Sequence, residues 1–138
     1  MTARFLALYD TPADPEAFDL HYRQVHIPLG SRLPGLRRYT LSRDAAAVRG
    51  TPYYLVAELE WDTMDELRAA FASAEGRATA ADAARLAELA PVRSMTFIAD
   101  DVVRPDTSSP APASIPVPAD TITGRSRSDS GERLWSAQ

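Results

Sequence analysis

The chain has 138 residues, of which 45% are hydrophobic and 25% charged, so its composition suits one small globular domain. Cysteine and lysine are both absent, which excludes disulfides, iron–sulfur clusters, a cysteine nucleophile and a lysine Schiff base. A net charge of −4 and short apolar stretches predict no nucleic-acid partner, no membrane span and no signal peptide, so we expect a cytoplasmic protein.

The first half of the chain predicts a strand, a helix and a second strand. The apolar run 4–9 precedes the turn residues Asp-Thr-Pro and is typical of a buried strand. A helix is expected to begin at Asp14, whose carboxylate can accept from free backbone amides, while Pro15 fits the first turn. Its apolar stripe consists of Phe18, Tyr22, Val25, Leu29 and Leu33. A Pro-Gly pair ends the helix, and residues 36–42 predict the second strand.

The second half predicts a strand, a helix and a last strand. Residues 53–61 alternate as a third strand, and Thr63-Met64-Asp65-Glu66 has the spacing of a helix capping box. We expect Gly76 to interrupt the following helix, which resumes until Pro91, and 92–99 to form the fourth strand. This order predicts an α+β fold, a ferredoxin-like βαββαβ unit with a four-stranded antiparallel sheet.

The composition changes sharply after Arg104, since five of the eleven prolines fall within residues 105–118. Such a segment has little apolar surface with which to offset the entropy of ordering. We therefore expect a folded domain over 1–104 and a disordered tail over 105–138. Helices of the predicted unit cover one sheet face only, yet the strands carry apolar residues on both sides. The second face needs cover, which predicts a homodimer.

The first helix and second strand contain motifs that resemble the signature of the EthD family. These are Phe18-x-x-His21-Tyr22-x-x-x-His26-x-Pro28-Leu29 and Leu33-Pro34-Gly35-Leu36-x-x-Tyr39, with further similarity at Trp61-Asp62-Thr63 and Ala81-Asp82. The resemblance covers residues 3–103. It implies a dimeric α/β barrel, in which two ferredoxin-like sheets pack face to face. That superfamily includes lactone isomerases, polyketide cyclases and dehydratases, and cofactor-free monooxygenases.

His26 is the first candidate catalytic residue. On a regular helical wheel it borders the apolar stripe on one side and His21 lies on the other, so the two rings should diverge and hold no metal. Pro28 should free the carbonyl of Gln24 and displace Ile27 from helical geometry. Two interpretations stay open: His26 is a structural residue that binds the freed backbone, or it donates and accepts protons in a pocket.

Tyr39 is the second candidate. In isomerase-like members of the family a histidine and a tyrosine at matching positions line the substrate pocket, so the resemblance pairs His26 with Tyr39. A tyrosine at the edge of the core is the alternative. Candidates for substrate contact are Tyr22, Leu29, Tyr54 and Trp61, although aromatic residues at helix and strand spacing more often form plain core. No glycine-rich phosphate loop is present in the sequence, so no nucleotide, flavin or other cofactor is expected.

The sequence and the resemblance together predict an enzyme for a small hydrophobic or aromatic oxygenated metabolite. Its chemistry would be cofactor-free acid–base catalysis of the isomerase, cyclase or dehydratase type. The alternatives are an oxidoreductase, either a cofactor-free monooxygenase or a reductase, and a non-catalytic ligand-binding accessory protein.

Overall fold

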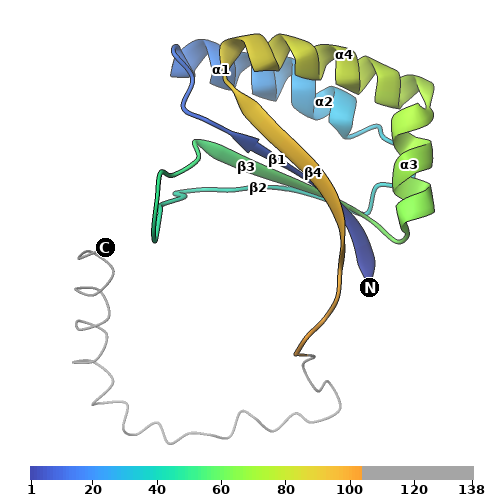
Figure 1. Ribbon diagram of the computed structural model, residues 1–138. Coiled ribbons are helices and arrows are strands. Elements are labelled where there is room, and N and C mark those ends of the chain that lie inside the picture. The colour runs from blue at the N-terminus through green and yellow to red at the C-terminus, as the bar shows by residue number, and fades with distance from the viewer. Residues whose placement is uncertain (104–138) are drawn as a thin grey trace, which may run out of the picture. The chain divides into compact units, whose positions relative to one another are not determined.

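The computed structural model describes residues 1–103, which form a strand, a helical segment, two strands, a second helical segment and a last strand (Figure 1). The elements are β1 (Thr2–Tyr9), α1 (Pro15–His21), the π-helical turn η1 (Tyr22–His26), α2 (Ile27–Gly30), β2 (Arg38–Leu41), β3 (Leu55–Trp61), α3 (Met64–Ala72), α4 (Ala74–Leu89) and β4 (Val92–Ala99). The predicted ferredoxin-like α+β order is confirmed. The tail predicted over 105–138 lies outside the described residues. No helix among residues 1–103 is long and apolar enough to cross a membrane.

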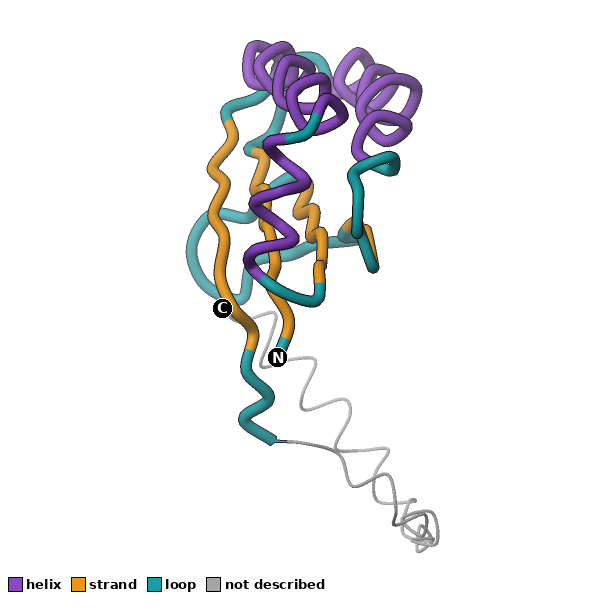
Figure 2. The backbone as a smooth tube through the Cα atoms, turned by 90° about the vertical axis from the view of Figure 1, so that its right-hand side faces the viewer, coloured by secondary structure: helices purple, strands orange, loops and turns teal. Residues whose placement is uncertain are grey.

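The four strands form one antiparallel sheet in the order β2-β3-β1-β4, and the helices cover one of its faces (Figures 1 and 2). Central strand β1 sets the register, with Ala7 opposite Ala57 of β3 and Ser94 of β4. Because side chains alternate along a strand, these small residues share the helix-facing side. The small side chains at the centre of the sheet leave space between the sheet and the helices.

Most of the core lies in this layer between sheet and helices. Trp61, Phe18 and Leu86 are its largest fully buried side chains. Phe18 and Tyr22 both pack against Tyr9 of β1, with ring centroids 5.2 and 5.8 Å apart. These contacts fix the first helix over the central strand, and they are worth more than burial alone because the rings meet edge to face.

The start signals read from the sequence act as predicted. Asp14 Oδ1 accepts a hydrogen bond from the amide of Ala17 at 3.2 Å, and Pro15 is the first helical residue. At the start of α3, Thr63 Oγ1 accepts from the amide of Glu66 at 3.1 Å. Each side chain satisfies one of the amides that a helix start leaves without a partner.

The first helix differs from the prediction in its middle. At η1 the amide of Ile27 donates to the carbonyl of Tyr22, five residues back instead of four. This turn takes in one additional residue, so Val25 moves outward to 37% exposure and His26 moves inward to 8%. Ile27 keeps ordinary right-handed helical angles, contrary to the expectation from Pro28.

The helix predicted to follow Thr63 is broken at Ser73 into α3 and α4, and not at Gly76 as predicted. Ser73 has extended angles, ends α3 and caps α4 by accepting from the amide of Gly76 at 3.0 Å. Gly76 is buried inside the first turn of α4, where an added Cβ would collide with the carbonyl oxygens of Ala70 and Phe71. The glycine therefore serves close packing between the two helices, and the serine makes the break.

Candidate functional site

A cavity of about 370 Å³ lies between the helices and the sheet. Its sheet side includes Ala7 and Ala57, the small residues at the centre of the sheet. Exposed residues among its lining are Ala80 of α4 and Ser94 and Thr96 of β4, so the cavity opens between that helix and that edge strand. Its volume falls within the range of small-molecule sites.

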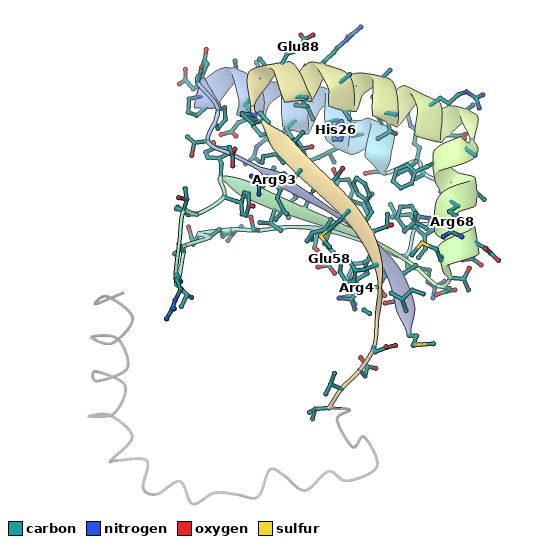
Figure 3. All side chains as sticks on the ribbon, in the orientation of Figure 1. Arg4, His26, Glu58, Arg68, Glu88 and Arg93 are labelled. Carbon is teal, nitrogen blue, oxygen red and sulfur yellow. The ribbon has the colours of Figure 1, made fainter. Side chains whose placement is uncertain are left out.

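His26 lines this cavity and is held by a buried carboxylate. Figure 3 shows His26 beneath the helices, on the side that faces the sheet. Its Nδ1 lies 2.9 Å from Oδ2 of Asp82, a residue of α4 that is 4% exposed. Because Nδ1 is engaged there, Nε2 is the ring nitrogen that a molecule in the cavity can meet.

The other oxygen of Asp82 binds the second histidine of the chain. Nε2 of His21 lies 2.7 Å from Oδ1 of Asp82. The expectation that the two histidines diverge was therefore wrong, because it assumed a regular α-helix. Residues five apart share a face where the hydrogen bonds run over five residues, and η1 supplies that turn between His21 and His26.

The electrostatics of this cluster favour an ionised Asp82 beside a neutral His26 ring. Burial pushes the pKa of Asp82 upward, but hydrogen bonds from His26 and His21 outweigh it and hold the pKa below its usual value. Burial lowers the pKa of His26, although the hydrogen bond to Asp82 opposes this. His26 is therefore a neutral ring that donates from Nδ1–H at neutral pH.

Two tyrosines meet at the cavity wall. The hydroxyls of Tyr22 and Tyr39 are 2.8 Å apart, and both side chains line the cavity. Burial raises the pKa of each, so both phenols stay protonated. The ring of Tyr39 passes close to α2, since a Cβ at Gly30 would lie 3.1 Å from its Cε2. One phenol donates to the other, which leaves one phenol proton for a ligand oxygen.

A comparison of the sequence with models of known protein families identifies the family of this chain. The EthD domain model matches residues 10–90, more than half of the chain, and that span contains both histidines, both tyrosines and Asp82. The chain belongs to the EthD domain family.

Relatives of known sequence and structure support this assignment. An uncharacterized 11.0 kDa protein of Rhodococcus erythropolis is 38% identical over 86 residues, which cover 61% of this chain and 82% of that protein. The crystal structure of an EthD family protein from Bacillus halodurans is 31% identical, with a TM-score of 0.66, covering 72% of this chain and 100% of that one.

Two more distant structures share the fold of this EthD protein. SnoaB of Streptomyces nogalater, described as a cofactor-independent oxygenase, is 21% identical with a TM-score of 0.57, covering 75% of this chain and 98% of that one. A dimeric ferredoxin-like protein of unknown function from Thermobifida fusca is 21% identical with a TM-score of 0.54, covering 72% of this chain and 92% of that one.

Within this EthD domain the remaining predicted contact residues lie apart from the cavity lining. Leu29 lines a separate shallow depression with residues of the α4 start. Tyr54 packs edge to face on Phe18 and its hydroxyl donates to Asp19 at 2.9 Å. Trp61 is fully buried, with Nε1 donating to the carbonyl of Pro34 at 2.8 Å. Of the four, the structure brings only Tyr22 to His26 and Tyr39.

Asp82 is the residue of this EthD site that sequence reasoning did not place there. It shares the buried face of α4 with Thr79 and Leu86, at spacings of three and four. A carboxylate on the apolar face of an alanine-rich helix needs a partner, which is a usable signal. Within residues 1–103 no group of three or more histidine and acidic side chains is arranged to hold a metal ion, and this cluster is joined by hydrogen bonds instead.

Proposed function

We propose that this EthD protein is an enzyme that performs cofactor-free acid–base chemistry on a small, neutral, hydrophobic or aromatic oxygenated molecule. The observation that carries the proposal is the position of His26, in the wall of the cavity with Nδ1 on the buried carboxylate of Asp82. A buried histidine with one nitrogen oriented and the other facing a cavity has the arrangement of a general base.

His26 is suited to remove a proton from carbon. Burial lowers its pKa, so the ring is neutral and able to accept at Nε2 near pH 7. As the ring becomes charged, Asp82 stabilises the imidazolium through the Nδ1–H bond without itself taking the proton. General base catalysis of this kind contributes about 10²–10⁴-fold to the rate.

The tyrosine pair supplies the complementary group. When a proton leaves the carbon beside a carbonyl, negative charge develops on the carbonyl oxygen, and the phenol proton of Tyr22 or Tyr39 can bind it. Return of the proton to another carbon completes an isomerisation. Ring closure by the same enolate, or loss of water from it, gives the cyclase and dehydratase reactions.

The cavity wall favours a neutral substrate. Its described lining contains the rings of Phe5, Tyr9 and Phe71 but no arginine, aspartate or glutamate. An anionic substrate would leave its charge without a partner in an apolar space, which is costly. The hydroxyls of Ser94 and Thr96 at the open side add polar contacts for an oxygenated ring.

An oxygenase is the second candidate, favoured by the structural similarity to SnoaB. Proton removal by His26 would generate a substrate carbanion or phenolate, and that anion would itself supply the electrons that reduce dioxygen. The same base and the same cavity would therefore serve both reaction types. Oxygen consumption distinguishes them.

We also propose that the protein is a homodimer that pairs through the open face of the sheet. By register, Leu6 and Leu8 of β1, Val56 of β3, and Met95 and Phe97 of β4 point away from the helices. Met95 is 51% exposed. Figure 3 shows Arg4 and Glu58 on this side, and they form an ion pair at 2.8 Å. Apolar side chains around a paired charge suit a self-complementary surface.

The test uses deuterium exchange, because it reports proton transfer before the substrate is known. The protein is incubated in D₂O with a panel of neutral aryl ketones, phenols and unsaturated lactones, and NMR follows loss of C–H signals. We expect exchange in the parent, a loss of about 10²-fold or more in His26→Gln, and a smaller loss in Tyr39→Phe. Gln24→Ala, an exposed change in the same turn, is the matched control.

Each outcome of this panel assigns a class. Exchange without oxygen consumption supports the isomerase, cyclase or dehydratase class, and exchange with oxygen consumption supports the oxygenase. A folded His26→Gln protein that exchanges as fast as the parent contradicts the role of His26. Binding of panel compounds with no exchange by any variant identifies an accessory binding protein instead.

A further inference from the structure

His21 and His26 are tied to one carboxylate from opposite sides. Asp82 Oδ1 lies 2.7 Å from Nε2 of His21, and Oδ2 lies 2.9 Å from Nδ1 of His26. The aspartate is 4% exposed, while the His21 side chain is 24% exposed and the His26 side chain 10%. The cluster therefore runs from the cavity, through a buried carboxylate, to a ring that reaches solvent.

The fold builds this cluster from three separate elements. His21 ends α1, His26 ends η1, and Asp82 comes from the middle of α4. The five-residue hydrogen bond from Ile27 to Tyr22 brings the two histidines onto one helix face. Turns of this type occur frequently at functional sites, and here the turn creates the shared contact with Asp82.

Each oxygen of Asp82 needs its own donor. A buried carboxylate oxygen without a hydrogen bond is costly, and a carboxylate held on one side only can rotate about its Cβ–Cγ bond. His21 occupies Oδ1 and so prevents that rotation. With Oδ1 held, Oδ2 stays on Nδ1 of His26.

We propose that His21 is a positioning residue for the base: it fixes Asp82, and through Asp82 it fixes His26 in the Nδ1–H form with Nε2 open to the cavity. The inference rests on the proposed function of His26, and it assigns His21 no contact with substrate. It predicts opposite tautomers for the two rings, since an ionised carboxylate only accepts. His21 must donate from Nε2–H and His26 from Nδ1–H.

The ionisable groups around His26 determine how the loss of His21 should change the pKa of His26. The ionisable groups near it are Asp82 from α4, His21 from α1, Tyr22 in its own turn, and Tyr9 and Tyr39, which share the cavity wall. The phenols are neutral because burial raises their pKa values. Repulsion between the two rings, if both were protonated, lowers the pKa of His26, and His21 also shares the carboxylate with it. Removal of His21 should therefore raise the pKa of His26.

The experiment is nitrogen-detected NMR of the full-length chain with labelled histidine. The chain has two histidines, so one single variant assigns both sets of ring signals. The parent protein should show one ring as Nδ1–H and the other as Nε2–H. An Nε2–H form at His26 in the parent overturns the proposal without any variant.

Substitutions at His21 separate positioning from simple structure. His21→Phe removes the donor to Asp82, so the His26 tautomer ratio should move about tenfold toward Nε2–H and its pKa should rise. His21→Gln keeps an N–H donor and should restore the Nδ1–H form, while the pKa of His26 should still rise because a glutamine cannot repel the protonated His26 ring. Gln24→Ala should change neither value.

The result that contradicts the proposal is an unchanged His26 tautomer and pKa in folded His21→Phe. This failure is distinct from failure of the proposed function. Deuterium exchange that depends on His26 with no response to His21 leaves the base in place and removes the positioning role. A His26 tautomer that follows His21 while exchange is independent of His26 removes the catalytic role instead.

Discussion

Gly76→Ala tests the close packing between α3 and the start of α4, the helix that carries Asp82. Within a helix this substitution ordinarily stabilises a protein by about 0.5–1 kcal/mol, because alanine restricts the unfolded chain. At this position the new Cβ would lie closer than 3.0 Å to the carbonyl oxygens of Ala70 and Phe71, an approach that real Cβ atoms essentially never make. Both oxygens belong to the backbone of α3 and cannot rotate away. The structure therefore predicts destabilisation where helix propensity predicts the reverse.

The size of the effect follows from the two opposing contributions. Overpacking by one methyl group costs about 1–3 kcal/mol and sometimes more, and rigid backbone neighbours favour the upper part of that range. After subtraction of the propensity gain, we expect a net loss of about 2 kcal/mol. For a domain of roughly 100 residues this lowers Tm by about 8–16 °C.

Thermal unfolding followed by circular dichroism measures this change, with urea unfolding as a second estimate. Ala84→Gly, at an exposed position of the same helix, is the matched control and should cost about 0.5–1 kcal/mol through propensity alone. A Gly76→Ala protein that melts at or above the parent temperature would refute the packing argument.

Three further predictions concern pH, the tail and assembly. Because the pKa of His26 in the folded protein is below its ordinary 6.5, the unfolded chain binds the proton more readily. The free energy of unfolding should therefore fall as the pH drops from 7 to 5. Urea titrations of His26→Gln should show a weaker pH dependence. A chain ending at Arg104 should melt within a few degrees of the full chain, since the sequence after it has little apolar surface to bury; a large loss would show that the tail packs. Light scattering should give a mass of about twice 15.0 kDa for the parent. Met95→Arg should move the mass toward 15.0 kDa, while Val25→Arg on the helical side should leave the mass unchanged. A monomeric parent contradicts the dimer.

The sequence was a good guide wherever local chemistry decides the structure. Asp14 and Thr63 mark helix starts because each side chain satisfies an amide only three residues away. The strands followed from alternation, which depends on a period of two that every strand obeys. Such signals are contained within a few neighbouring residues, and a single sequence is enough to read them.

The site was harder to predict because it depends on distant contacts. The wheel argument for His21 and His26 assumed 3.6 residues per turn, and one π-helical turn was enough to reverse its conclusion. The break at Ser73 and the packing role of Gly76 depend on how α4 meets α3. Asp82 approaches the histidines from 56 and 61 residues away, so its role appears only when the helices are packed together.

The π-helical turn also affects how this protein should be aligned with its relatives. His21 and His26 are five residues apart, whereas an ordinary α-helix brings side chains four residues apart onto one face. Deletion of one residue between them, such as the exposed Gln24, would restore the spacing of four and convert η1 to a regular α-helix. Both rings would still point toward α4. A family member with His-x-x-x-His at this place can therefore hold the same pair, and a gap between the two histidines is to be expected when such sequences are compared.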